Sequence, residues 1–255
     1  MDDMTRSTPY PDASSSIAIA IDDVLGLELP QAEAPAPEIP AYLRDTYHWA
    51  YIHPRNVRWL DREIVVRTIL WQQHNRLQRL AFKEIEPGQN VLQAASVYGR
   101  FVPNLAAHVG PGGRFDVVDV AEVQVDSARR KLGDHPHARA HHANILDYHV
   151  KPYDTVVCYF LLHEVPEKVK FDVVNHLLGK IEAGGKAVFV DYHKPRWWHP
   201  LKPITSIVFD TLEPFAKGLW QREIRDFAFT PDRFDWRKET IFGQLFQKVV
   251  ATRRP

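Results

Sequence analysis

The sequence has a single cysteine, no excess charge of either sign and no long apolar run. The lone thiol, Cys158, excludes a disulfide framework and a thiolate zinc cluster within one chain, and it favours a reducing cytoplasm. The 32 basic residues are matched by 32 acidic residues, whereas a nucleic-acid-binding protein usually carries a basic excess. No uncharged apolar run approaches the ~18 residues that span a bilayer, which excludes an integral membrane protein.

Several catalytic signatures are missing as well, including a P-loop, a nucleophile elbow and a Ser-His-Asp order. What is present is 255 residues with 45% apolar character, enough for a globular domain with a sizeable core. Residues 1–40 are rich in Pro, Ser, Ala and acidic residues, which predicts a flexible arm that is not a secretory signal. Residues 41–255 predict one domain, with an aromatic N-terminal cover over 41–87 and a substrate-side tail over 193–239.

The domain should alternate strands with helices. Apolar residues at helical spacing predict one long amphipathic helix over 60–85, ended by Pro87-Gly88. Short apolar runs predict strands over 90–95, 114–120, 137–143, 153–160 and 186–192, with helices over 100–108, 121–132 and 167–181. A helix over 205–217 and one or two strands over 240–253 complete the chain. This order predicts an α/β, Rossmann-like fold with a doubly wound, mostly parallel sheet, whose ligands bind at the carboxyl ends of the strands.

The turn after the first strand reads VLQAASVYGRF, residues 91–101. A nucleotide-binding turn at this place commonly reads acid-x-Gly-x-Gly-x-Gly. On that pattern Gln93 takes the place of the acid, and Ala95, Val97 and Gly99 take the places of the glycines. Because one glycine remains, the turn is either a divergent nucleotide site or an ordinary strand-to-helix turn that needs the backbone freedom of Gly99.

Two polar residues follow the next strands. Asp119 ends the second strand at a spacing from which its carboxylate could bind both ribose hydroxyls of a nucleoside. The other interpretation is a helix cap or a solvated acid. Asn144 follows the third strand, where it either bonds an adenine edge or serves a plain turn.

The fourth and fifth strands carry imidazoles and carboxylates to the same edge of the sheet: Tyr159, Phe160, His163, Glu164, Asp191 and His193. Such groups form either an acid/base pair or an oxygen and nitrogen metal site. The other interpretation is that the histidines are structural. Cys158 lies inside an apolar strand, so we expect an inert thiol.

The order of these motifs resembles that of class I S-adenosylmethionine-dependent methyltransferases over residues 85–195, and 153–195 are similar to quinone-ring C-methyltransferases. A closer resemblance is to the rhodoquinone biosynthesis enzymes, which are methyltransferase-like. It is carried by Val97-Tyr98-Gly99 in the turn, the aromatic segment YHWAYIHP at 47–54, and FGQLFQKVVA at 242–251.

This resemblance implies that ubiquinone loses a ring methoxy group and gains an amino group, with S-adenosylmethionine as the nitrogen donor and a manganese ion assisting. It implies three sets of site residues. The catalytic set is Gln93, Tyr98, His163, Asp191 and His193. The cofactor-binding set is Gln93, Ala95, Val97, Tyr98, Gly99, Asp119, Val120, Asn144, Ile145 and Tyr159. The metal-binding set is His163, Asp191 and His193.

Gln93 suggests how a methyl donor could become an amine donor. An acid at this position would stabilise the ammonium form of the methionine moiety and raise its pKa, whereas an amide would not. Since an ammonium group has no lone pair, the free amine is the form that can add to a quinone ring. The alternatives are a conventional C- or O-methyltransferase acting on a quinone or another aromatic, and a non-catalytic, methyltransferase-like partner subunit.

A lipid quinone would require contact with a membrane surface. The tryptophans all lie outside residues 82–195, and Trp197 and Trp198 stand among Lys194, Arg196 and Lys202, a composition typical of an interfacial contact. The other interpretation is that both tryptophans pack in the core or cover the active site. We therefore expect a cytoplasmic protein peripherally associated with the inner membrane.

Overall fold

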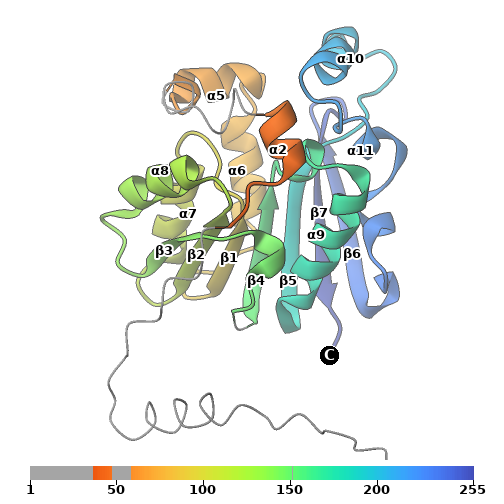
Figure 1. Ribbon diagram of the computed structural model, residues 1–255. Coiled ribbons are helices and arrows are strands. Elements are labelled where there is room, and N and C mark those ends of the chain that lie inside the picture. Colours follow the sequence, from red (N-terminus) through yellow and green to blue (C-terminus); the bar gives the residue numbers. More distant parts are fainter. Residues whose placement is uncertain (1–36, 48–58, 151) are drawn as a thin grey trace, which may run out of the picture. The chain divides into compact units, whose positions relative to one another are not determined.

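The computed structural model describes residues 37–47, 59–150 and 152–255 (Figure 1). Residues 1–36 of the arm expected over 1–40 and residues 48–54 of the aromatic segment 47–54 lie outside these ranges. Residues 37–255 form one compact unit. Within the described ranges no helix has the length and apolar character needed to cross a bilayer.

A single sheet of seven strands runs in the order β3-β2-β1-β4-β5-β7-β6. Strands β1 to β5 pair in parallel, and β7 runs antiparallel to both of its neighbours. The predicted α/β fold with a doubly wound, mostly parallel sheet is therefore confirmed. The strands are β1 (Asn90–Ala94), β2 (Arg114–Asp119), β3 (Ala138–His142), β4 (Tyr153–Tyr159), β5 (Ile181–Tyr192), β6 (Phe234–Ile241) and β7 (Phe246–Arg253).

Helices cover both faces of this sheet, because alternate side chains of each strand point to opposite sides. Val91 belongs to a core cluster with α6, α7 and α8, whereas Leu92 belongs to a cluster with α9, α11 and η3. The helices are α2 (Ala41–Thr46), α5 (Glu63–Ile69), α6 (His74–Phe82), α7 (Phe101–Val109), α8 (Glu122–Leu132), α9 (Glu167–Gly179), α10 (Lys202–Thr211) and α11 (Gly218–Gln221). Short 3-10 turns are η1 (Ile145–Asp147), η2 (Leu162–Glu164), η3 (Ile224–Phe227) and η4 (Pro231–Arg233).

The prediction of one helix over 60–85 is wrong, because the chain forms α5 and α6 with a break between them. Trp71 and Gln72 have φ angles of 50° and 62°, which a right-handed helix cannot contain. The apolar spacing is helical on both sides of the break, so the periodicity does not reveal it. The break separates α6, which packs in the core, from α5, which has no buried residue.

The helix expected over 205–217 is also divided. It ends at Thr211, and α11 begins at Gly218. Pro214 lies between them and disfavours helical geometry at the residue before it, Glu213. This places Glu213 in a connection, from which it reaches the site described below.

Candidate functional site

The turn from β1 to α7 has positive φ angles of the kind found in glycine-rich turns, although Gly99 is its one glycine. Ala95 has a φ of 64° and Gly99 a φ of 79°. The backbone N–H of Gly99 donates to Asp61 Oδ1 at 2.9 Å, and Lys131 Nζ donates to the same oxygen at 2.5 Å. A Cβ at Gly99 would come within 3.3 Å of Val66. Gly99 thus needs to be glycine, while Ala95 adopts a conformation that a side chain disfavours.

A small cavity of about 70 Å³ opens beside this turn. The predicted cofactor residues that line it are Ala95, Asp119, Val120, Asn144 and Ile145. Asp119 accepts the N–H of Ser96 at 2.7 Å and that of Ala121 at 2.8 Å, one on each carboxylate oxygen. Since each oxygen can accept a further bond, anchoring the turn and binding a ribose are compatible roles.

Asp119 is more easily protonated than an ordinary aspartate. Burial raises its pKa to about 6, although hydrogen bonds from the backbone of Ala121 and Ser96 act in the opposite direction. Asn144 uses its carbonyl oxygen to accept the N–H of Leu146 at 3.1 Å, so the turn interpretation holds for that atom. Its amide nitrogen is the atom that remains suited to donate to a base.

Helix α2 covers this cavity. Tyr42 and Leu43 line it together with Pro40, and Tyr42 lies close enough to Glu164 and Asp119 to interact with both carboxylates. Burial, followed by these two carboxylates, raises the pKa of the Tyr42 phenol to about 12. The small cavity is therefore closed by a segment far away in the sequence.

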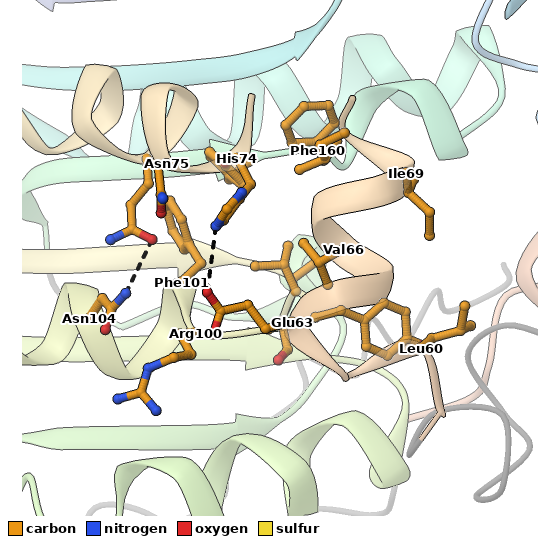
Figure 2. A pocket seen from close by; sticks show the side chains of 18 of the residues that line it. Leu60, Glu63, Val66, Ile69, His74, Asn75, Arg100, Phe101, Asn104 and Phe160 are labelled. Atoms are coloured by element: carbon orange, nitrogen blue, oxygen red, sulfur yellow. Dashed lines mark hydrogen bonds and ion pairs between the residues drawn. The ribbon is translucent and has the colours of Figure 1, made fainter. Parts of the chain in front are cut away.

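A second cavity of about 190 Å³ lies between α5, α6 and the carboxyl ends of β1, β4 and β5. Figure 2 shows Leu60, Val66 and Ile69 on one side of it and Phe101 and Asn104 on another. The predicted residues that line it are Ala95, Val97, Tyr98, Gly99, Tyr159, Phe160, His163 and Glu164. Since Ala95, Ser96 and Glu164 line both cavities, the two spaces meet at the turn after β1.

A buried ion pair lies at the inner end of the larger cavity. His163 Nδ1 donates to Asp191 Oδ1 at 2.9 Å, and the two residues are 5% and 1% exposed. Backbone N–H groups of Leu162, His163 and Tyr192 also donate to Asp191. The carboxylate is thus held from several sides, and it orients the imidazole that borders the cavity.

His163 carries its proton at neutral pH. Burial lowers its pKa, but the Asp191 carboxylate outweighs burial and raises the pKa to about 9. Its ring meets those of Phe160 and Tyr192 edge-on, with centroids 5.8 Å and 4.9 Å apart. Burial also raises the pKa of Glu213, which lines the same cavity. The site therefore offers a charged imidazolium within aromatic surroundings, suited to donate a hydrogen bond to a substrate oxygen.

Gln93 lies beneath the turn and lines neither cavity. Its side chain is fully buried, and Nε2 donates to the carbonyl oxygen of Ala95 at 2.9 Å. Its Oε1 is buried and has no hydrogen-bond partner among the described residues. Gln93 thus presents an uncharged side chain with an unsatisfied buried acceptor beneath the turn at which the two cavities meet.

The predicted metal ligands are not brought together. His193 Nδ1 lies 3.0 Å from the carbonyl oxygen of Gln244, its Nε2 lies 2.9 Å from Lys238 Nζ, and it lines a different cavity. Within the described part of the chain, no group of three or more His, Cys, Asp or Glu side chains is arranged to hold a metal ion. The residues predicted to bind manganese therefore do not fit that role here.

Some lining residues were missed by sequence reasoning. Ser96 borders both cavities and has a buried hydroxyl, but it stands at a variable position of the turn. Glu213 lies in the connection after α10, and Tyr42 lies in α2. Neither stands at the end of a strand, and no sequence motif marks them. Pro214, which keeps Glu213 out of a helix, was the one local signal available.

Residues 92–187 match the family model of a methyltransferase domain. The chain has the class I methyltransferase fold. A structure of an O-methyltransferase family protein from Burkholderia thailandensis is 16% identical, with a TM-score of 0.62, and the match covers 95% of this chain and 70% of that one. The N-methyltransferase NodS from Bradyrhizobium japonicum, solved with S-adenosyl-L-homocysteine, is 14% identical with a TM-score of 0.55, covering 85% and 100%.

One curated relative matches this chain over part of its length. Malonyl-[acyl-carrier protein] O-methyltransferase 1 from Ilyobacter polytropus is 22% identical over 163 residues, which cover 64% of this chain. The chain spans 59% of the length of that relative. These likenesses agree with the methyltransferase-like fold derived from the strand order and leave the substrate to be argued from the site.

Replacing Asp191 should uncover the effect of burial on His163. In Asp191→Asn we expect the pKa of His163 to fall well below about 9, because the largest effect that raises it is removed and burial is then opposed by Glu213 and Glu164 alone. NMR titration of the histidine ring signals measures this shift. Asp210→Asn, which removes an exposed carboxylate of α10, should leave the titration unchanged. An unaltered pKa of His163 in Asp191→Asn would contradict the assignment.

Replacing Ala95 by glycine should cost far less stability than the same change next to it. Glycine relieves a positive φ that costs a side chain about 1 kcal/mol, which offsets the ~0.4–1 kcal/mol of added chain entropy in the unfolded state. Ala94→Gly, in a buried strand, has no such offset and should lower the free energy of unfolding by about 1 kcal/mol or more. Denaturant unfolding compares the two, and equal losses would contradict the strained turn.

Proposed function

We propose that the protein binds S-adenosylmethionine across the two cavities and transfers a group to an apolar, carbonyl-bearing substrate in the larger one. The support is the meeting of the cavities at Ala95 and Ser96, with Asp119 and Asn144 on the nucleoside side. In this proposal the methionine end of the donor lies near the turn and Glu164. The larger cavity supplies aromatic walls and the charged His163.

More specifically, we propose that the transferred group is the amino group, that the substrate is a lipid quinone such as ubiquinone, and that a ring methoxy group is replaced to give rhodoquinone. The observation that carries this is Gln93, which puts an uncharged amide beneath the turn at which the cavities meet, where an acid would add the negative charge that holds an amine as ammonium. The resemblance of the turn Val97-Tyr98-Gly99 to the rhodoquinone biosynthesis enzymes points to the same reaction.

The ring substitution follows from the groups present. The amine nitrogen forms a bond to the ring carbon that bears methoxy, and electron density moves onto the conjugated carbonyl oxygen. The His163 imidazolium can stabilise this oxygen by hydrogen bonding. When the carbonyl re-forms, the bond to methoxy breaks, and the methoxide takes the proton that the added nitrogen gives up and leaves as methanol. The product of this step is an aminoquinone whose nitrogen still carries the carbon skeleton of the donor, so breaking the bond between that nitrogen and the donor Cα is a separate, later step.

Methyl transfer to an aromatic or acidic acceptor is the second candidate. It is favoured by the match of residues 92–187 to a methyltransferase domain and by the O-methyltransferase relative. The same cavities would serve both reactions, since they differ in which group of the donor faces the acceptor. The two reactions are therefore distinguished by which atoms of the donor appear in the product.

Donor labelling decides between them. The protein is incubated with a lipid quinone and S-adenosylmethionine labelled in the methyl carbon or in the amino nitrogen, and the quinone product is analysed by mass spectrometry. We expect the nitrogen label in the product and methanol released. Label from the methyl carbon would replace our first proposal with the second.

Gln93→Glu tests how the amine is activated. The new carboxylate should raise the pKa of the donor amine, and each unit of that shift leaves about tenfold less free amine below it. We expect the amination rate at neutral pH to fall about tenfold or more and to recover as the pH rises, while donor affinity is retained. Retained affinity, measured by calorimetry, serves as the folding control. An unchanged rate with an unchanged pH profile would exclude this role.

Donor binding should weaken in mild acid because of Asp119. Its carboxylate accepts from ribose hydroxyls when ionised, and since burial raises its pKa to about 6, this acceptor is lost as the pH falls through that value. Calorimetric binding of S-adenosylhomocysteine from pH 5 to pH 8 measures this. In Asp119→Asn the affinity should be lower and lack that pH dependence. Asp126→Asn on the exposed side of α8 should behave like the wild type.

A further inference from the structure

Exposed large apolar side chains are concentrated around two helices. Among the residues that the structure describes, all but two of them, Val150 and Phe229, lie either in residues 59–69, around α5, or in residues 197–212, around α10. Trp197 is 85% exposed, and Ile64 and Ile207 are 66% and 65% exposed. We call this set the apolar rim: Trp59, Ile64, Ile69, Trp197, Trp198, Ile204, Ile207 and Leu212.

The sequence of α10 places apolar side chains on the exposed side of the helix. Ile204, Ile207 and Thr211 follow one another at intervals of three and four residues and share its exposed side, whereas Thr205 and Phe209 are buried on the other. The nearest acid, Asp210, is paired with Lys217 at 2.5 Å. The outward face of α10 is therefore apolar and carries little net charge.

Basic side chains border this face. Arg196 lies over the ring of Trp198 with its guanidinium carbon 5.8 Å from the centroid, and Lys194 and Arg196 are exposed. None of Lys194, Arg196 and Lys202 forms an ion pair with a carboxylate of the described residues. Tryptophan and isoleucine next to uncompensated cations match a surface of apolar chains beneath anionic headgroups.

The apolar rim also adjoins the larger cavity. Ile69 is 48% exposed and at the same time lines that cavity. Figure 1 shows α5 and α10 at the same end of the domain, beyond the sheet. At Ile69 the apolar rim thus meets the cavity, as a route for a molecule that leaves a lipid phase would require.

We propose that the apolar rim docks on an anionic lipid bilayer. Trp197 and Trp198 enter the headgroup region, Ile204 and Ile207 enter the acyl boundary, and Lys194 and Arg196 bind anionic headgroups. Both tryptophans are exposed, so the interpretation that they pack in the core is wrong. Docking goes beyond the proposed function, since it holds for any reaction that the cavities support.

Vesicle binding tests the docking without donor or substrate, so its outcome is separate from that of the labelling experiment. The full chain is sedimented with vesicles of phosphatidylcholine, with or without phosphatidylglycerol. We expect strong binding to the anionic vesicles and weak binding to the neutral ones. Trp197 fluorescence, compared with a Trp197→Phe variant, should shift to shorter wavelength on binding.

Matched variants identify the surface. The double change Ile204→Ser and Ile207→Ser should weaken binding about tenfold or more, since each side chain loses several buried methyl or methylene groups. Lys194→Gln with Arg196→Gln should cost about fivefold per charge, on anionic vesicles only. Phe229→Ser, which removes an aromatic side chain that is 69% exposed elsewhere, is the control and should bind as the wild type does.

Two results would overturn the proposal. Equal binding by the isoleucine variant and the wild type would mean that another surface contacts the lipid. A dimer in solution that the isoleucine variant breaks, without binding of the wild type to anionic vesicles, would assign the apolar rim to a second copy of the chain. Light scattering on both proteins distinguishes that case.

Discussion

The contact between His163 and Asp191 is the interaction on which the site depends. It joins η2, which follows β4, to the end of β5, and backbone N–H groups from both segments converge on the same carboxylate. The Asp191 carboxylate raises the pKa of the neighbouring imidazole to about 9 despite its burial. The geometry of two parallel strands thereby holds a protonated imidazole at the inner end of a cavity, paired with Asp191 and with its Nε2 3.7 Å from Glu164 Oε1.

The side chain at position 93, beneath the turn after β1, acts on the donor side of the proposed reaction, opposite the protonated His163. In the proposed amination, a carboxylate at position 93 would favour the ammonium form of the donor amine, whereas Gln93 adds no charge. On the acceptor side, the protonated His163 would donate a hydrogen bond to the oxygen that gains electron density. The proposal thus gives the nucleophile an uncharged neighbour and the electrophile a charged hydrogen-bond donor.

The strands and the small cavity could be predicted from the sequence, because apolar runs and strand-end polar residues are local signals. Asp119 and Asn144 lie together for this reason. The break at Trp71 and Gln72 was not predictable, since non-glycine residues with positive φ leave no trace in periodicity. His193 was expected near Asp191 and His163 because all three stand at the carboxyl side of adjacent strands. However, β5 ends at Tyr192, and the His193 ring contacts Gln244 in the turn before β7.

The break also explains how the cavity and the apolar rim come from the same residues. A continuous helix over 60–85 would extend α6 and keep its apolar stripe against the core. By leaving the helix at Trp71 and Gln72, the chain sets α5 apart, so that Val66 and Ile69 line the cavity while Ile64 is exposed. Burying Ile64 and Ile69 against a lipid phase would recover hydrophobic free energy that the domain leaves unused. A segment that is costly to expose in water is therefore consistent with a partner that is itself apolar.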